Sequence, residues 1–262
     1  MVLYGAVVVR SFRRYATYRI ATLAGVFTNT VFGFLICFVY IALWSQRSGL
    51  GGYDIRDAIT YAWVAQSLLM TVAVFGGGFQ DEFAERVRRG DIAVDLYRPV
   101  NLQLWWLAGD LGRAAYHLLA RGIPPTVIGA IVFDLRLPGV AGWAVFLVSV
   151  TLAVVVSFAV RYLVALTAFW LVDSRGVDYL VGVCATFLSG MLMPLVLFPG
   201  WLGELARALP WAATVQVPID VFLGKDDVLR LLVFQAGWAV VLLLAGQVVT
   251  GLATRKLVVQ GG

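Results

Sequence analysis

Four ionisable residues, Asp110, Arg113, His117 and Arg121, follow one another at spacings of three, four and four in a long apolar run. At about 100° per residue, these positions share one sector of a helix face. Ionisable side chains at membrane depth usually face a bundle interior or a wet cavity, so this face predicts a polar lining for a transport path. The alternative is that Asp110 and Arg113 lie outside the bilayer and pair locally, while Arg121 extends toward the interface. Arg161, in the next apolar run, is open to both interpretations.

The sequence offers little for catalysis. His117 is the only histidine, so a site with several histidine ligands is excluded, and no H-E-x-x-H motif occurs. Ser189 and His117 both fall in apolar runs, but Ser189 lacks the G-x-S-x-G context of an activated serine. No G-x-x-x-x-G-K-[ST] motif occurs either, so the chain cannot hydrolyse ATP through a P-loop. We predict no catalytic, cofactor-binding or metal-binding residue in this chain.

The elements that must position these residues are membrane-spanning helices. The chain of 262 residues is 61% hydrophobic and 13% charged, whereas a soluble domain is about half apolar and a quarter charged. A span needs roughly 20 apolar residues. The sequence predicts an all-α integral membrane protein, one domain over residues 1–262, with six spans at 21–44, 58–78, 104–133, 142–172, 177–198 and 228–253.

Basic residues indicate how these spans are oriented. With both termini on one side, 11 Lys and Arg fall on that side and 6 on the other, which predicts cytoplasmic termini. The net charge of +5 then reflects topology and anionic lipid head groups, not nucleic acid. In residues 1–20, Val8, Phe12 and Tyr15 lie on a different face from the arginines, which predicts an interfacial helix. Positive flanking of the first span explains these arginines equally well.

A charged loop at residues 79–101 follows the second predicted span. Phe79, Phe83 and Val87 recur at every fourth position, acids come before arginines as the helix dipole favours, and Gly90 ends the pattern. The pattern predicts a short amphipathic helix. Such a helix either docks a cytoplasmic partner or belongs to a solvated loop that sets topology.

The segment between the fifth and sixth predicted spans is broken by prolines at positions 194, 199, 210 and 218. A short amphipathic helix is predicted between them, with an apolar face of Trp201, Leu202, Leu205 and Leu209, and Pro218 is expected to interrupt the next apolar run. Irregular backbone at membrane depth must be buried in protein or line a wet cavity, because lipid cannot satisfy its hydrogen bonds. Residues 199–225 therefore predict a gate or lid on the outer side of the membrane.

Four stretches of sequence carry a resemblance: ERVRRGDIAVDLYRPV at 85–100, ALTAFWL at 165–171, SGMLMPLVLFPGWLGELARALPWAATVQVPIDVFLGK at 189–225 and RKLVVQGG at 255–262. Together they resemble permease subunits of type-2 ABC transporters, in the bacterial branch of small six-span permeases with largely unassigned substrates. The third and fourth stretches are the more specific, and the resemblance covers nearly the whole chain. Trp211 is a mild departure, because the family more often has phenylalanine after Pro210.

The resemblance implies a permease half that works with a second permease, identical or related, and with two copies of a separate ATPase subunit. ATP and magnesium would be bound by that ATPase. The loop at 79–101 would couple to it through Phe83, Glu85, Arg86, Arg88, Arg89, Gly90, Asp91, Asp95, Arg98 and Pro99. The broken segment would form extracellular re-entrant helices, with a gate made of Pro194, Pro199, Trp201, Glu204, Arg207, Pro210, Pro218 and Gly224.

The leading hypothesis is an ATP-driven export permease in the bacterial plasma membrane, moving a lipophilic or amphipathic compound past aromatic and aliphatic walls. A membrane scaffold or immunity component that binds partners without transport is a second hypothesis, although it leaves the broken segment without a purpose. Half of an ion-driven secondary transporter is a third. Such transporters usually show repeats and acidic ion ligands, and Asp110 is the only acid clearly within a predicted span.

Overall fold

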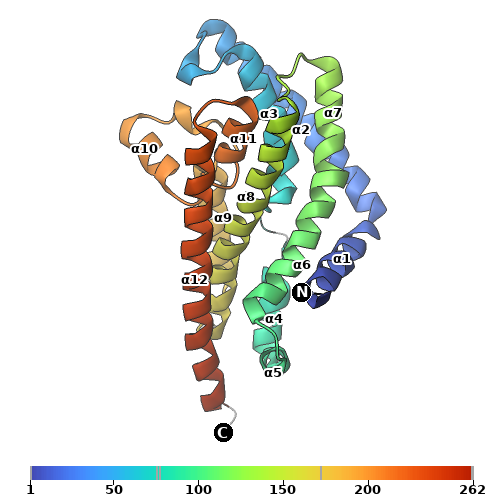
Figure 1. Ribbon diagram of the computed structural model, residues 1–262, viewed down its shortest axis with the longest axis vertical. Helices are drawn as coiled ribbons and strands as arrows, with labels where there is room; N and C mark the ends of the chain where they lie inside the picture. Colours follow the sequence, from blue (N-terminus) through green and yellow to red (C-terminus); the bar gives the residue numbers. More distant parts are fainter. Residues whose placement is uncertain (1, 75, 77, 172, 261–262) are drawn as a thin grey trace.

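The computed structural model describes residues 2–74, 76, 78–171 and 173–260, and this part of the chain is helical without strands (Figure 1). Its α-helices are α1 Val2–Ala16, α2 Arg19–Gln46, α3 Ile55–Thr71, α4 Gln80–Arg89, α5 Ile92–Tyr97, α6 Leu102–His117, α7 Ile123–Val132, α8 Val140–Leu166, α9 Arg175–Leu188, α10 Gly200–Ala208, α11 Gln216–Leu223 and α12 Val228–Gln260. Short 3₁₀ turns lie at Leu50–Gly52, Thr167–Phe169 and Leu195–Leu197, and a π-helical turn lies at Leu118–Gly122.

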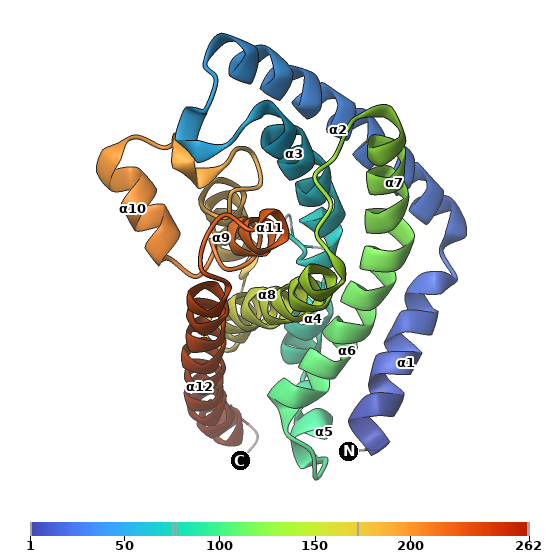
Figure 2. The same cartoon turned by 45° about the horizontal axis from the view of Figure 1, so that its top comes forward.

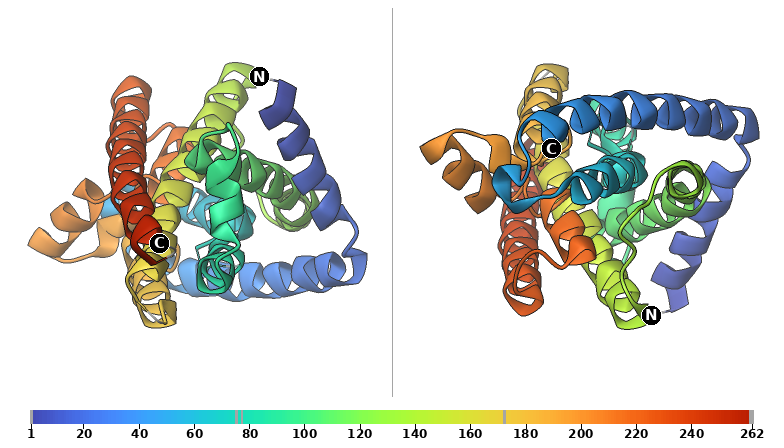
Figure 3. Two further views of the ribbon diagram at one scale, coloured as in Figure 1. Left: turned by 90° about the horizontal axis from the view of Figure 1, so that it is seen from below. Right: turned by 90° about the horizontal axis from the view of Figure 1, so that it is seen from above.

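The helices form one elongated bundle around α8 (Figures 1 and 2). We call the end with α10, α11 and the start of α3 the outer end, at the top of Figure 1, and the end with α4 and α5 the inner end. Helices α2 and α12 lie on opposite flanks of the bundle (Figure 3). Helix α1 packs along α6, where Gly112 allows close contact: a Cβ added there would come within 2.2 Å of the Val8 carbonyl oxygen.

Three helical segments are long and apolar enough to cross a membrane: Arg19–Gln46, Val140–Phe169 and Val228–Arg255. They coincide with the first, fourth and sixth predicted spans. The chain is thus an all-α protein with apolar helices suited to a bilayer. The remaining three predicted spans differ from simple 20-residue helices, and the differences have local causes. Parts of the second and fourth predicted spans, at 75, 77 and 172, lie outside the described residues, as do 261–262 of the closing stretch.

The second predicted span, 58–78, was placed too far along the chain. Helix α3 begins at Ile55, because Asp54 and Asp57 form a reciprocal capping box there, and it ends at Thr71. Side chains from other helices donate hydrogen bonds to the carbonyl groups at that end, so the helix need not continue. Ala73 then adopts a positive φ of 51° and the helix does not resume before Gln80.

The third predicted span, 104–133, corresponds to one rod from Leu102 to Val132, in which α6 and α7 are joined by the π-helical turn. Pro124 stands at the start of α7, where a missing backbone N–H costs little. At 1.5 Å per residue the rod is about 46 Å long, which exceeds a hydrocarbon core of ~30 Å. The wider turn adds one residue to the helical repeat and lets the rod pass the prolines without a sharp kink.

The fifth predicted span, 177–198, is wrong at its far end. Helix α9 stops at Leu188, and the chain turns at Ser189 and Gly190, before Pro194 and Pro199 are reached. Gly190 has φ +88°, and a Cβ on it would come within 2.5 Å of the Tyr61 hydroxyl. The break therefore follows from tertiary contact at a glycine, and not from the prolines to which the sequence attributes it.

Pro218 does not interrupt a helix as predicted. It lies in the first turn of α11, where its missing N–H is not needed by the helix and its fixed φ favours helical backbone. The amphipathic helix expected after Pro199 is α10, Gly200–Ala208. Its buried residues are Gly203 and Ala206, while Trp201 and Leu205 of the predicted apolar face are exposed.

Candidate transport site

The polar residues of α6 meet α8 in a buried ion cluster near the inner end. The Asp110 carboxylate accepts from Arg113 Nε at 2.6 Å and from Arg161 Nη2 at 2.6 Å, so helices α6 and α8 share one acid between two arginines. The Asp110 and Arg113 side chains are each 1% exposed and that of Arg161 is 7% exposed. The local pairing of Asp110 with Arg113 is present, and it is buried within the protein. Such burial makes the charges mutually dependent.

The same cluster holds the end of α3. Arg113 donates from Nη1 to the Met70 carbonyl at 2.6 Å and from Nη2 to the Thr71 carbonyl at 2.9 Å. Ser157 donates to the Val72 carbonyl, and Arg161 Nε donates to Ser157 Oγ at 3.3 Å. These contacts satisfy carbonyl groups that a helix C-terminus leaves without partners. The cluster therefore fixes the turn after α3 between α6 and α8.

His117 and Arg121 do not join this cluster. His117 packs at 5.3 Å between ring centroids against Tyr15 of α1. Arg121 lies in the π-helical turn, and its guanidinium rests against Gly25 of α2, where an added Cβ would be 2.2 Å away. The four residues that share a face in the sequence are thus divided among three neighbouring helices, and of them only Asp110 and Arg113 meet Arg161.

The stripe of α4 faces the chain's own core. Phe83 is fully buried, and its ring packs against Trp106, Tyr162 and Phe169 at centroid distances of 5.6, 5.8 and 6.1 Å. The stripe fastens α4 to α6 and α8, so the charged outer face of α4 is the face that remains for a docking partner. Gly90, with φ +79°, ends the helix as predicted.

The charged residues at 79–101 divide into an internal and an external set. Asp95 is buried and accepts from Arg86 Nε at 2.6 Å and Arg98 Nη1 at 3.3 Å, which ties α5 to α4. Glu85 pairs along the outer face of α4 with Arg88 and Arg89, and the hydrogen bond from Arg89 holds the pKa of Glu85 below its ordinary value. Of the predicted coupling residues, those exposed to a partner are Arg88, Arg89, Gly90, Asp91, Arg98 and Pro99.

At the outer end, Gln216 is the centre of a hydrogen-bond network that closes the broken segment. Its Oε1 accepts from the Tyr61 hydroxyl and from the Leu195 backbone N–H, both at 2.9 Å, and its backbone N–H donates to the Ser189 carbonyl at 2.8 Å. Its Nε2 donates to Asp220 at 2.9 Å. One side chain thus joins α3, α11 and the turn after α9.

Asp220 completes this network without a cation. It accepts from the Tyr53 hydroxyl and from Gln216, and no residue that the structure describes forms an ion pair with it. Burial raises the pKa of Asp220 above its ordinary value. Nearby, the fully buried Asp57 is paired with Lys225 and with Arg136 Nε at 3.0 Å. The cationic side chains of Lys225 and Arg136 therefore pair with Asp57 and not with Asp220.

The predicted gate residues around this network differ in burial. Pro194, Pro210 and Pro218 are buried, whereas Pro199, Trp201, Glu204, Arg207 and Gly224 are exposed. Gly224 has φ +64° and ends α11. Helix α10 projects from the side of the bundle (Figure 2) and carries three of the exposed residues, Trp201, Glu204 and Arg207.

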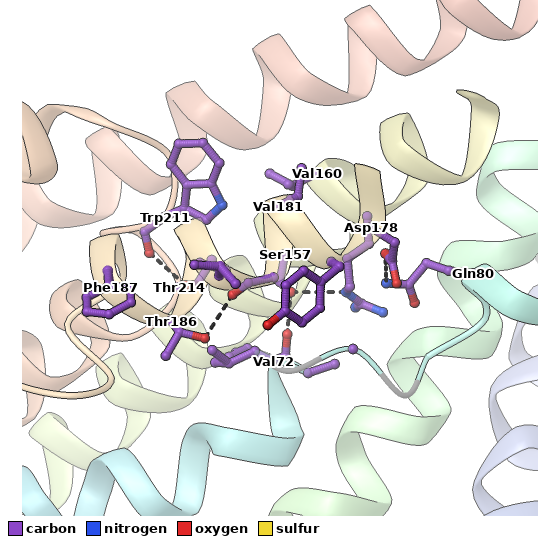
Figure 4. Close-up of a pocket in the computed structure, with 18 of the residues that line it drawn as sticks. Val72, Gln80, Ser157, Val160, Asp178, Val181, Thr186, Phe187, Trp211 and Thr214 are labelled. Carbon is purple, nitrogen blue, oxygen red and sulfur yellow. Dashed lines mark hydrogen bonds between the residues drawn. The ribbon is translucent and has the colours of Figure 1, made fainter. Parts of the chain in front are cut away.

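A cavity of about 620 Å³ runs along α9 between the two ends (Figure 4). Asp178 and Gln80 lie at one end of it, and Trp211 and Phe187 lie at the other. Its middle is lined by valines and by Ser157, next to Arg161. Gln80 Oε1 and Trp211 Nε1 are buried without a hydrogen-bond partner in the described structure. The cavity therefore has an apolar middle with unused polar groups at its two ends.

Among known protein families, a family model described as ABC-2 family transporter protein matches residues 29–261. The chain belongs to the ABC-2 transporter family. It is a permease of that family: an integral membrane protein that takes part in transport and works with an ATP-binding subunit. No curated protein matches the chain.

Several residues that organise this permease have no sequence motif. Gln216, Tyr61 and Ser157 were not expected to matter, because a single glutamine, tyrosine or serine in an apolar run is common. Gln235 is also fully buried, and it joins Ser149 of α8 to the Ala213 carbonyl. The sequence signal for Gln216 and Gln235 is an amide in an apolar helix. Because an unpaired polar group is costly there, such an amide usually bonds to a neighbouring helix.

Proposed function

We propose that this permease is one half of an ATP-driven exporter, and that the cavity along α9 is its share of the path for a lipophilic or amphipathic substrate. The observation that carries the proposal is the position of that cavity, which reaches from the ion cluster of Arg161 to Trp211 of the outer segment. An apolar lining with a few polar groups at its ends suits a compound of the same character.

A second permease, identical or related, would complete the path. Helix α9 has no buried residue, and its large side chains Tyr179, Leu180 and Phe187 are 77%, 63% and 51% exposed. Contiguous exposed apolar residues beside a cavity are typical of a surface that another protein or lipid covers. The assembly would hold two ATPase subunits, which bind ATP and magnesium, at the cytoplasmic side with both termini of this chain.

The inner end supports a coupling role for 79–101. Because Phe83 is packed against α6 and α8, force on the outer face of α4 would reach α8, which carries Arg161 and lines the cavity. The Asp95 ion pairs make α4 and α5 move together. ATP-driven closure of the ATPases would thus rearrange the path, and the outer segment at 199–225 would open.

The coupling role is tested by co-purification with the ATP-binding subunit of this transporter. The double change Arg88→Glu and Arg89→Glu reverses charge on the exposed face of α4, and we expect the ATPase to be lost from the purified membrane complex. Arg47→Glu is the matched control, because Arg47 is exposed beyond α2 at the other end of the protein. Equal recovery of the ATPase with both variants would contradict the coupling role.

The path is tested by filling the cavity. Gly182 lines it and Gly176 does not, although both lie on α9 with open space around a Cβ. In the assembled complex, Gly182→Trp should abolish stimulation of ATP hydrolysis by amphipathic compounds while basal hydrolysis persists. Gly176→Trp should leave the stimulation intact. Normal stimulation of the Gly182→Trp complex would rule the cavity out as the path.

A further inference from the structure

A second cavity, of about 630 Å³, lies at the inner end between α1, α4, α5 and α6. Figure 2 shows α1 on one side of α6, with α5 below the start of α6. We call this cavity the inner groove and define it by Arg10, Arg14, Glu82, Arg98, Trp105 and Trp106. Its lining shares no residue with that of the cavity along α9, although Asp110 of the groove forms an ion pair with Arg161 of that cavity.

The inner groove is positively charged. Five arginines and three carboxylates line it, which leaves two positive charges. Arg14 is paired with Glu82 at 3.0 Å, and Arg86 and Arg98 share Asp95. Arg10 has no ion pair with any residue in the described part of the chain, and it is exposed. The groove therefore offers at least one uncompensated guanidinium to an anion.

The walls of the groove are amphipathic. Leu3 and Val7 of α1 line it beside Arg10, and Trp105 and Trp106 line it from α6. Arg98 lies over the Trp105 ring at 5.6 Å, and Trp106 Nε1 is buried without a hydrogen-bond partner among the described residues. Tryptophans prefer the level of the lipid headgroups, where one side of the ring is apolar and the other is wet.

We propose that the inner groove binds an anionic phospholipid of the cytoplasmic leaflet, with the headgroup phosphate at Arg10 and Arg98 and an acyl chain against Leu3 and Val7. Basic pockets between helices on the cytoplasmic side bind acidic head groups. An acidic protein segment would match the charge but would have no use for the aliphatic wall of α1. The proposal rests on the cytoplasmic orientation of the inner end and is independent of export.

The test titrates the full-length chain, in a neutral detergent, with dioctanoyl phosphatidylglycerol and counts bound lipid by native mass spectrometry. Arg10→Gln and Arg98→Gln should each weaken binding about fivefold, because an arginine near an acidic headgroup contributes about that factor. The double variant should lose about 25-fold. Arg13→Gln is the matched control: Arg13 is exposed on the same helix but does not line the groove.

Two further ligands identify the chemistry that is recognised. Dioctanoyl phosphatidylcholine, which has no net charge, and glycerol 1-phosphate, which has no acyl chain, should both bind more than tenfold more weakly than phosphatidylglycerol. Equal binding of phosphatidylcholine would overturn the charge argument. Equal binding of glycerol 1-phosphate would show a phosphate site without lipid, and equal losses with Arg13→Gln and Arg10→Gln would show general attraction to the α1 surface; either result overturns the proposal.

Discussion

Two carboxylates of the permease, one near each end, are held in opposite ways. Asp110 at the inner end lies between two arginines, and it is the only acid of that cluster. Asp220 at the outer end is held by the neutral groups of Tyr53 and Gln216, without an ion pair in the described structure. The first arrangement depends on charge and the second on hydrogen bonds. We infer that the contact of α6 with α8 is fixed by mutual compensation of charges, whereas the Gln216 and Asp220 network can be released bond by bond.

The strongest test of this contrast is Asp110→Asn. It leaves Arg113 and Arg161 buried without a counter-ion, and removing one member of a buried ion cluster costs about 3–5 kcal/mol. We expect that loss in the free energy of unfolding, measured with denaturant in detergent. The triple change of Asp110→Leu, Arg113→Met and Arg161→Met removes all three charges and should cost less than Asp110→Asn, although the Met70 and Thr71 carbonyls lose their bonds from Arg113. An equal loss in the two proteins would show that charge does not hold the inner end.

At the outer end, Gln216→Leu should lower the free energy of unfolding by about 3 kcal/mol, because it leaves the Leu195 N–H without its partner and removes one hydrogen bond each from Tyr61 and Asp220. Gln247→Leu is the matched control, since Gln247 is exposed and bonds only to Asn101 among the described residues. Thermal unfolding of the two variants measures the difference. If both lose the same stability, Gln216 does not organise the outer end.

Gly190→Ala tests whether backbone shape also closes the outer end. With φ +88° and the Tyr61 hydroxyl 2.5 Å from an added Cβ, the change should cost about 2 kcal/mol. Gly237→Ala, in α12 with open space around it, should instead stabilise by about 0.5–1 kcal/mol. The midpoints of thermal unfolding of the two variants should move in opposite directions. A shift in the same direction would show that the backbone shape at Gly190 does not help to close the outer end.

The smallest effect is expected from Asp220→Asn, within about 1 kcal/mol, because the amide keeps most of the hydrogen bonds. The pKa of Asp220 is raised in the folded protein, so the folded state holds its proton to higher pH than the unfolded state does. Its contribution therefore falls as pH rises from the unfolded to the folded pKa. Unfolding followed against pH should show that decline in the original protein and lose it in Asp220→Asn; an unchanged pH profile would contradict the assignment.

What the sequence predicted well was local. Phe83 and Val87 of the predicted stripe lie on α4, Phe79 stands directly before it, and Gly90 ends that helix because only a residue without Cβ adopts φ +79° easily. The extents of α2, α8 and α12 follow from long apolar runs. These features depend on residues a few positions apart, so periodicity and composition contain them.

What the sequence missed depends on partners far along the chain. The neighbouring sequence does not show that α9 ends at Leu188, because the end depends on hydrogen bonds of Tyr61 and Gln216 from other helices. Likewise Asp110 predicted a polar face, but only the packing of α6 on α8 shows that Arg161 completes its cluster. The roles of the pathway, coupling and gate residues remain predictions that the variants above can test.

The Gln216 network also sets an order of events during synthesis. Tyr61 and Tyr53 precede Gln216 by 155 and 163 residues. At 5–20 residues per second, a ribosome needs on the order of 10 s or more between them. Tyr53 and Tyr61 therefore enter the membrane region without Gln216, and their hydroxyl groups must stay hydrated or find other partners until α11 emerges. The last fifth of the chain is thus required to finish a structure that the first quarter begins, so a ribosome stalled before residue 216 leaves the outer end open.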